Sequence, residues 1–180
     1  MNLASPRLPN NPRVPTHPDF TIRRATVADV PAVLPMVAAI VAQHEAWDPD
    51  RYATLPDVLD RYERWLPARA QDDRGVFLVA QTPAPPSDPP TLVGFLVATI
   101  DPNIPIYTLK EYAFIQDLWV EPAHRRRGIA RALVQTAITH LRAQGITQIR
   151  LETAAPNDPA RRLFESLGFR TSTIDMLLSL

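Results

Sequence analysis

The stretch "AHRRRGIARAL", from Ala123 to Leu133, decides how the rest of the chain is interpreted. Three consecutive arginines are followed by a glycine and then by residues that favour a helix. Such a stretch fits a patch that binds nucleic acid, or one wall of a loop that binds a phosphate group. A third interpretation is a solvated basic turn in front of a core helix.

The sequence on either side favours the phosphate loop. "YAFIQDLWV", which ends at Val120, predicts a strand, and "GIARALVQTAITHLRAQG" predicts a helix that ends at Gly145. Backbone N–H groups at a helix N-terminus lack intrahelical partners and carry the positive end of the dipole, so they attract anions. Gly128 would let a phosphate approach the backbone, and the small Ala130 would keep the second turn clear. With three arginines around it, this turn is expected to bind a pyrophosphate.

Composition argues against several other classes of protein. The 19 basic residues are balanced by 19 acidic ones, whereas a protein that binds duplex nucleic acid usually has a basic surplus. Without cysteine, the protein can form no disulfide and use no thiolate of its own. No apolar run approaches the roughly 20 residues of a membrane span, and the N-terminus lacks the apolar segment of a secretory signal. We expect a soluble cytoplasmic protein that binds neither nucleic acid nor membrane.

The chain divides into an arm and a domain. Residues 1–18 carry a proline at every third position from Pro6 to Pro18. A polyproline II helix has three residues per turn, so it would align these rings in one stripe, but a disordered tail fits the same composition. We expect a proline-rich N-terminal arm at 1–18 and an independent domain at 19–180.

Strands and helices alternate along this domain. "FTIRRA" predicts a strand, and "TVAD" predicts a capping box that opens an apolar helix to about Gln43. Pro31 and Pro35 require that this helix starts later or kinks. Apolar residues at helical spacing predict a second helix at 55–70. Further strands are expected at 75–81, 91–100, 112–120, 147–154 and 169–180, and further helices at 128–145 and 157–168. This order predicts an α/β fold, a sheet covered by helices on both faces.

Two motifs resemble those of the GCN5-related N-acetyltransferase (GNAT) family. The first family motif begins with Arg or Gln, has Gly three residues later, and has Gly or Ala two residues after that. In "DLWVEPAHRRRGIARALVQ", Arg125, Gly128 and Ala130 match these three positions. The second motif is matched by "NDPARRLFESLGF", through Asn157, Ala160, Phe164, Gly168 and Phe169. The resemblance covers about residues 20–175. It implies a mixed, mostly antiparallel central sheet, helices on both faces, and a cofactor cleft where two central strands splay apart.

The resemblance also implies acetyl-CoA as co-substrate in that cleft. Backbone groups of Leu118 and Val120, with Trp119 between them, would pair with the pantetheine arm, and Asn157 would contact it. The first motif, beginning at Arg125, would cradle the pyrophosphate through the backbone amides of Arg126, Arg127, Gly128, Ile129, Ala130 and Arg131. No metal is expected.

The implied reaction is direct attack of an amine on the thioester in a ternary complex. An alkyl amine has a pKa of about 10.4 and arrives protonated, so a base must remove a proton. Asp117, on the central strand, is the leading candidate, although a structural acid near a bulge fits the same position. His44, after the first helix, is another candidate, although histidine at a helix C-terminus is often only a favourable cation. Tyr112, with Glu111, is expected in a loop that forms the substrate rim.

Phe164 departs from the family pattern. Many members have a tyrosine at this position, and its hydroxyl protonates the leaving thiolate. Because Phe164 has no proton to donate, solvent, Tyr112 or Tyr107 would have to do so. The aromatic residues Trp47 and Tyr52 would line an acceptor pocket unless they belong to the core.

The sequence therefore predicts an acetyl-CoA-dependent N-acetyltransferase that acts on a primary amine of a small molecule or peptide. A homodimer is one expected form. A second interpretation is a non-catalytic module that senses acyl-CoA. The residues do not name the acceptor amine.

Overall fold

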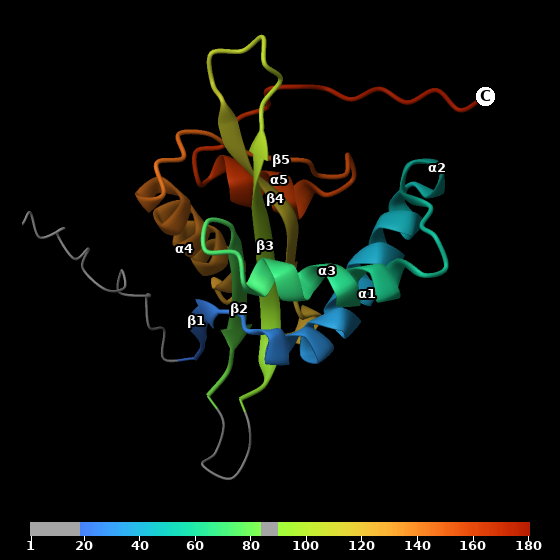
Figure 1. Cartoon of the computed structure of the whole chain (residues 1–180). Helices are drawn as coiled ribbons and strands as arrows, with labels where there is room; N and C mark the ends of the chain where they lie inside the picture. Colours follow the sequence, from blue (N-terminus) through green and yellow to red (C-terminus); the bar gives the residue numbers. More distant parts are fainter. Residues whose placement is uncertain (1–18, 84–89) are drawn as a thin grey trace, which may run out of the picture.

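A central sheet organises the computed structural model, which describes residues 19–83 and 90–180. Its strands are β1 (Thr21–Arg24), β2 (Val76–Gln81), β3 (Leu92–Pro102), β4 (Glu111–Val120) and β5 (Ile149–Leu151). They lie in sequence order across the sheet (Figure 1). The first three pairings are antiparallel, and β4 pairs with β5 in parallel. The predicted mixed, mostly antiparallel sheet is confirmed. The arm predicted at 1–18 lies outside the described residues.

Helices cover both faces of this sheet, as predicted. α1 (Val30–Trp47) and α3 (Val58–Ala70) pack on one face, with the short α2 (Pro49–Tyr52) between them in sequence. α4 (Ile129–Ala143) packs on the other face together with α5 (Asp158–Glu165) (Figure 1). Two apolar cores result, one on each side of the sheet.

The first helix starts later than the capping box suggested. The box at Thr26 opens a 3₁₀ turn, η1 (Val27–Asp29), and α1 follows with Pro31 in its first turn, where proline is tolerated. Contrary to expectation, Val27–Trp47 is long and apolar enough to cross a membrane by length and composition alone. In the fold, however, the buried residues of α1, among them Val33 and Val37, pack in the core of one sheet face.

A β-bulge in β4 decides which face each of its side chains occupies. Asp117 pairs with Val97 and Ile115 pairs with Ala98, so Gln116 has no counterpart on β3. Regular alternation would put Ile115 and Asp117 on the same face, and an extra residue puts them on opposite faces. Ile115 accordingly belongs to the core beside α4, whereas Val97, the partner of Asp117, belongs to the core beside α1 and α3.

Two predictions about elements are wrong. The segment 169–180 contains no strand, and Ile174 and Met176 within it are exposed. The residues of this segment are compatible with a strand, but a strand also needs a neighbouring edge, and no strand that the structure describes pairs with this segment. Glu111 and Tyr112 pair with Pro102 and Asp101 of β3. They therefore lie in β4, as the strand predicted at 112–120 implied for Tyr112, and the loop expected at Glu111 and Tyr112 is wrong.

Candidate active site

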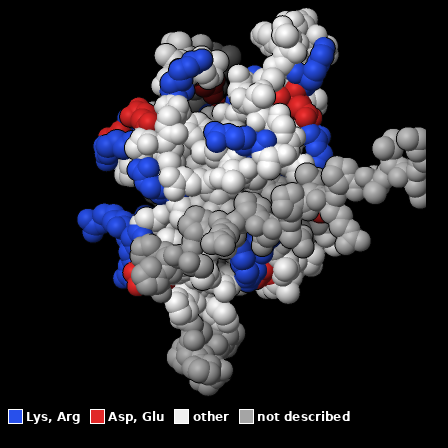
Figure 2. Space-filling model, turned by 90° about the vertical axis from the view of Figure 1, so that its left-hand side faces the viewer, with Lys and Arg blue, Asp and Glu red and all other residues white. Residues whose placement is uncertain are grey.

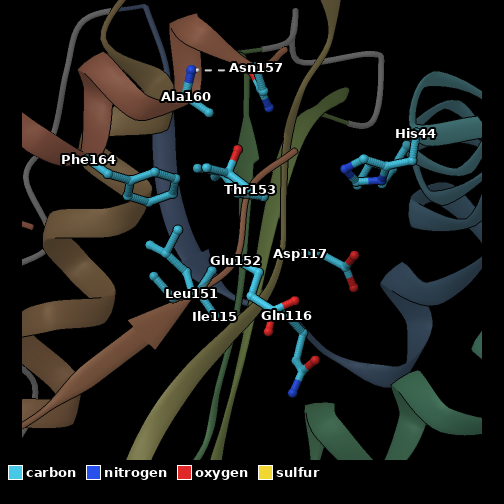
Figure 3. Close-up of a pocket in the computed structure, with 12 residues that line it drawn as sticks. His44, Ile115, Gln116, Asp117, Leu151, Glu152, Thr153, Asn157, Ala160 and Phe164 are labelled. Carbon is cyan, nitrogen blue, oxygen red and sulfur yellow. Dashed lines mark hydrogen bonds between the residues drawn. The ribbon is translucent and has the colours of Figure 1, made fainter. Parts of the chain in front are cut away.

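A pocket opens where β4 and β5 part. β5 pairs only with residues Ala113–Ile115 of β4, so no described strand accompanies Gln116–Val120 on that side. The predicted cleft between splayed strands lies here (Figure 3). The residues that line it are Ile40, His44, Ile115, Gln116, Asp117, Leu118, Leu151, Glu152, Thr153, Asn157, Ala160 and Phe164.

Along β4, the backbone N–H and C=O groups of alternate residues point into this gap. The N–H of Glu121 donates to the carbonyl of Val93 on the β3 side, at 2.9 Å. The carbonyl of Val120 instead accepts from Nε of Arg125 at 2.9 Å, on the other side. Backbone N–H and C=O groups alternate in direction along a strand. Those of Leu118 and Val120 therefore point away from β3. These are the groups that were predicted to pair with an extended pantetheine arm.

The N-terminus of α4 is open at the end of β4. Gly128, its N-cap residue, has φ +84°, and Arg126 has φ +61°, so two residues of the loop adopt the left-handed conformation. No side chain caps the helix and no acidic residue lies in its first turn. Successive N–H groups of such a turn form a concave anion site. This geometry fits a pyrophosphate.

The arginines of the loop have different roles. The Arg125 guanidinium lies 4.6 Å from the centre of the Trp119 ring. The hydrogen bond from its Nε to the carbonyl oxygen of Val120 fixes the start of the loop. Arg126 and Arg127 are exposed and add positive charge beside the helix end. Arg131 ties α4 to the end of α5 through a 2.7 Å hydrogen bond to the Ser166 hydroxyl.

The side chains of Ile129 and Ala130, at the start of α4, belong to the core. Ile129 is buried in the core, and Ala130 packs against the same core. The ring of Trp119 lies in the opposite core, beside α1 and α3. The side chains of these three residues therefore stabilise the walls of the cleft, as expected if the cofactor is held mainly by peptide groups.

Asp117 is a buried carboxyl group that lacks a full set of partners. The Tyr62 hydroxyl donates to its Oδ1 at 3.3 Å, while Oδ2 is buried without a hydrogen-bond partner among the described residues. Burial raises the pKa of Asp117 to about 6, and the bond from Tyr62 partly opposes this rise. Asp117 is thus mostly ionised at neutral pH, and it supplies a basic carboxylate among the residues that line the pocket.

His44 faces the same pocket from α1 (Figure 3). Its ring stacks on Tyr52 with centroids 4.8 Å apart and meets the edge of Trp47 at 5.4 Å. Partial burial lowers the pKa of His44 below its ordinary value, so the imidazole is neutral at pH 7 and can accept a proton. The structure therefore brings together two of the three predicted catalytic residues. Trp47 lines a smaller adjoining hollow.

Tyr112 is not among the residues that line this pocket. Its ring lies under the Arg150 guanidinium, 3.8 Å from the centroid, beside the paired part of β4 and β5. Its strand neighbour Glu111 forms an ion pair with Arg74 at 2.6 Å. Both side chains thus have structural partners away from the cleft, and the expected loop at the substrate rim is replaced by strand.

Helix α5 supplies the opposite wall. Asn157 caps the helix by accepting from the N–H of Ala160 at 3.3 Å, and this bond turns the residue toward the pocket (Figure 3). Phe164 is buried at the pocket wall, where its ring meets the edge of Phe169 at 5.3 Å. Asn157 and Phe164 therefore both line the pocket from the side of α5.

Sequence reasoning missed other residues of the site. Tyr62 is one of the residues at helical spacing that predict the helix at 55–70, and the sequence indicated no other role for it. A tyrosine on the apolar face of a helix usually needs a partner for its hydroxyl, and this is the signal that could have found it. Gln116 donates to the Thr99 hydroxyl at 2.9 Å and fixes the bulge. Glu152 lines the pocket because β5 ends just before it. No short-range pattern predicts either of these positions.

Basic side chains do not merge into one surface on the face that carries β1 and α4. Figure 2 shows blue Lys and Arg groups there interspersed with red Asp and Glu groups. A duplex-binding surface presents its positive charge as a continuous patch or stripe. The described part of this face does not show such a continuous patch.

Comparison with known proteins gives a family match over most of the chain. The model of the Acetyltransferase (GNAT) family matches residues 40–169. Mycothiol acetyltransferase of Thermobispora bispora is 41% identical over 58 residues, which make up 32% of this chain and 20% of that protein. The [ribosomal protein bS18]-alanine N-acetyltransferase of Escherichia coli is 39% identical over 62 residues, 34% of this chain and 42% of that protein. The chain thus spans less than half the length of these relatives.

A solved structure shows the same fold over nearly the whole chain. The crystal structure of a predicted acetyltransferase with acetyl-CoA from Clostridium acetobutylicum superposes with a TM-score of 0.68. The alignment covers 89% of this chain and 96% of that protein, at 17% sequence identity.

Proposed function

Because the chain belongs to the GNAT acetyltransferase family, we propose that it transfers an acetyl group from acetyl-CoA to a primary amine of a small molecule or peptide. The observation that carries this proposal is the gap between β4 and β5, with the uncapped N-terminus of α4 at its end. An extended thioester arm fits the gap, and its pyrophosphate fits the helix end. Two relatives named as acetyltransferases support the same reaction class.

Some residues of the pocket would bind the cofactor, and others would transfer a proton. The peptide groups of Leu118 and Val120 would hold the pantetheine arm, and the loop from Arg126 to Gly128 would hold the pyrophosphate. Bound acetyl-CoA supplies the thioester carbon that the amine attacks. Asp117 takes the proton of the incoming ammonium group, because its basic Oδ2 is buried at the pocket and lacks a partner among the described residues. His44, which is neutral and faces the pocket from α1, provides a second route for that proton.

A thiol-release screen tests this function. Purified protein, acetyl-CoA and a panel of primary amines should give amine-dependent release of free CoA thiol, and the protein contributes no thiol background because it has no cysteine. The panel should contain a polyamine, an aminoglycoside, free amino acids and peptides with free N-termini. Binding of acetyl-CoA without release for any amine would instead support an acyl-CoA-sensing module.

Phe164→Tyr should raise kcat where departure of the thiolate limits the rate. The ring lines the pocket, so the added hydroxyl places a proton donor near the departing sulfur. General acid assistance is worth about 10²–10⁴-fold when the assisted step is limiting, and at least a tenfold gain is expected under that condition. The KM for the amine should hardly change, since the hydroxyl acts only on the leaving group. Steady-state kinetics with the best amine measure both.

Two matched variants serve as controls for this result. Phe169→Tyr adds the same hydroxyl to a ring that packs on Phe164 but does not line the pocket, and it should leave kcat unchanged. Tyr112→Phe should also have no effect, because that ring lies under Arg150 in the sheet. A loss of activity in Tyr112→Phe would show that this tyrosine is the acid after all.

A further inference from the structure

The carboxyl group of Asp117 has a hydrogen-bond partner on α3. The Tyr62 hydroxyl donates to Oδ1 at 3.3 Å, and this is the one hydrogen bond that the described residues provide to the group. The two residues are 55 positions apart in the sequence, so the packing of α3 on the sheet is what brings them together. Because Asp117 is only 7% exposed, water is poorly placed to replace Tyr62 as a donor.

The ring and the hydroxyl of Tyr62 have separate surroundings. The ring packs against the core beside α1 and α3 and meets the edge of the Trp65 ring, with centroids 5.8 Å apart. The hydroxyl contacts the carboxyl group on β4. Burial, together with the nearby Asp117 carboxylate, raises the pKa of Tyr62, so the hydroxyl keeps its proton at neutral pH and can donate it in a hydrogen bond. Replacement by phenylalanine would therefore remove the donor and keep the ring.

This hydrogen bond favours the ionised form of Asp117. A charged carboxylate oxygen is a stronger acceptor than a neutral one, so a donor placed beside it lowers the pKa of the group. Burial acts in the opposite direction, and the net result is a pKa of about 6. Without the Tyr62 hydroxyl, burial would be unopposed and the carboxyl group would keep its proton to a higher pH. The donor thus decides how much of the base is available near neutral pH.

The other groups around Asp117 leave this role to Tyr62. His44 faces the pocket from α1, and partial burial lowers its pKa, so it is neutral at pH 7. Glu152 lines the pocket beyond the end of β5, but its side chain is 74% exposed and its charge is screened by water and salt. On β3, the residue opposite Asp117 is the apolar Val97. Among the described residues, burial and the bond from Tyr62 therefore set the acidity of this carboxyl group.

We propose that Tyr62 is a positioning residue for the base of the proposed acetyl transfer: its hydroxyl fixes the carboxyl group of Asp117 and favours the ionised form that accepts a proton. This role rests on the proposed function, in which Asp117 takes a proton from the incoming ammonium group. Tyr62 is not among the residues that line the pocket or the smaller adjoining hollow. It therefore acts through Asp117 and not on the substrate.

Tyr62→Phe should move the titration of Asp117 to a higher pH. One hydrogen bond to a charged group corresponds to about one to two pH units. At 3.3 Å this bond is longer than most O–H···O hydrogen bonds, so the lower end of that range applies. The midpoint should move from a pH of about 6 in the wild type to about 7 in the variant. An NMR titration of the Asp117 carboxyl carbon, assigned by its loss in Asp117→Asn, measures this midpoint without substrate or activity.

The same displacement should appear in catalysis. Relative to the wild type, kcat/KM of Tyr62→Phe for the best amine should fall about fivefold at pH 6 and hardly at all at pH 9, because the fraction of ionised base differs only at low pH. In the Asp117→Asn background, Tyr62→Phe should change kcat/KM by less than about twofold, because the group through which it acts is gone. A tyrosine that only stabilised the fold would lower activity by a similar factor at every pH and in both backgrounds.

Tyr112→Phe is the matched control for the loss of a hydroxyl. Its ring lies under the Arg150 guanidinium and does not line the pocket, so both midpoints should match those of the wild type. An Asp117 midpoint that stays at about 6 in Tyr62→Phe would overturn the inference, and so would a midpoint that moves while kcat/KM does not follow it. Acetyl transfer itself survives both outcomes, since thiol release continues. A wild type that releases no thiol with any amine at any pH would instead overturn the proposed function, and the role of Tyr62 with it.

Discussion

Acetyl-CoA should raise the melting temperature of the wild-type protein and should leave that of Gly128→Glu unchanged. A ligand at 100 times its Kd stabilises the folded state by about 2.7 kcal/mol, which is a shift of roughly 5–10 °C for a chain of this size. In the variant, a carboxylate stands at the N-terminus of α4, where the pyrophosphate would bind. Repulsion and bulk together should abolish binding in a thermal-shift assay or by calorimetry.

The backbone offers a matched control for this substitution. Gly128 and Gly145 lie at opposite ends of α4 with nearly equal φ, +84° and +81°, and a Cβ added at either meets no atom within 4 Å. Any side chain therefore strains both positions similarly, by about 1–2 kcal/mol, but only the first lies at the proposed anion site. Gly145→Glu should lower the melting temperature and retain the full response to acetyl-CoA. If Gly128→Glu also kept that response, the phosphate loop would be wrong.

Replacement of Asp117 by Asn should lower kcat by about 10²–10⁴-fold while making the protein more stable at neutral pH. The amide keeps the shape of the side chain and can still accept from the Tyr62 hydroxyl, but it cannot take a proton from the amine. The gain in stability has a separate cause, because the substitution removes a carboxylate that is buried without a full set of partners. Steady-state kinetics and thermal denaturation across pH 4–8 measure the two effects.

The pH dependence of this gain follows from the raised pKa of Asp117. The folded protein binds the Asp117 proton up to a pH of about 6, whereas the unfolded chain releases it near its ordinary pKa of about 3.9. The contribution of this group to stability is therefore fully present below pH 4 and is lost as pH rises through 6. The free energies of unfolding of wild type and Asp117→Asn should match near pH 4 and differ by up to roughly 3 kcal/mol, in favour of the variant, at pH 8.

The same titration should be visible in catalysis. If Asp117 is the base, kcat/KM of the wild type rises with pH through about 6, where the carboxyl group loses its proton. His44→Gln provides a comparison, since it removes the second acceptor of protons in the pocket. A variant Asp117→Asn that gains stability but keeps wild-type kcat would identify His44 or solvent as the base and would leave Asp117 as a structural acid.

The sequence by itself determined the features that depend on neighbours in the chain. The glycine and the open helix start after Val120, the cap at Asn157, and the order of strands and helices all rest on short-range rules of backbone conformation and periodicity. These rules were sufficient to predict the sheet with helices on both faces and the open helix start that follows β4. The position of Asn157 and Phe164 at the cleft was instead implied by the resemblance of the second motif to that of the GNAT family.

Only the tertiary structure decided the features that depend on partners distant in the sequence. One unpaired residue, Gln116, turns Asp117 toward α1 and α3, and that insertion exists only in the register between β4 and β3. The pairing of Tyr112 with Arg150 likewise joins residues on two different strands. The final segment, 169–180, was predicted to be a strand, yet no described strand pairs with it, because the composition of a segment says nothing about which sheet edge is free to accept it. Local pattern fixes conformation along the chain, whereas the chemistry of the pocket depends on which strands meet, and at which residue.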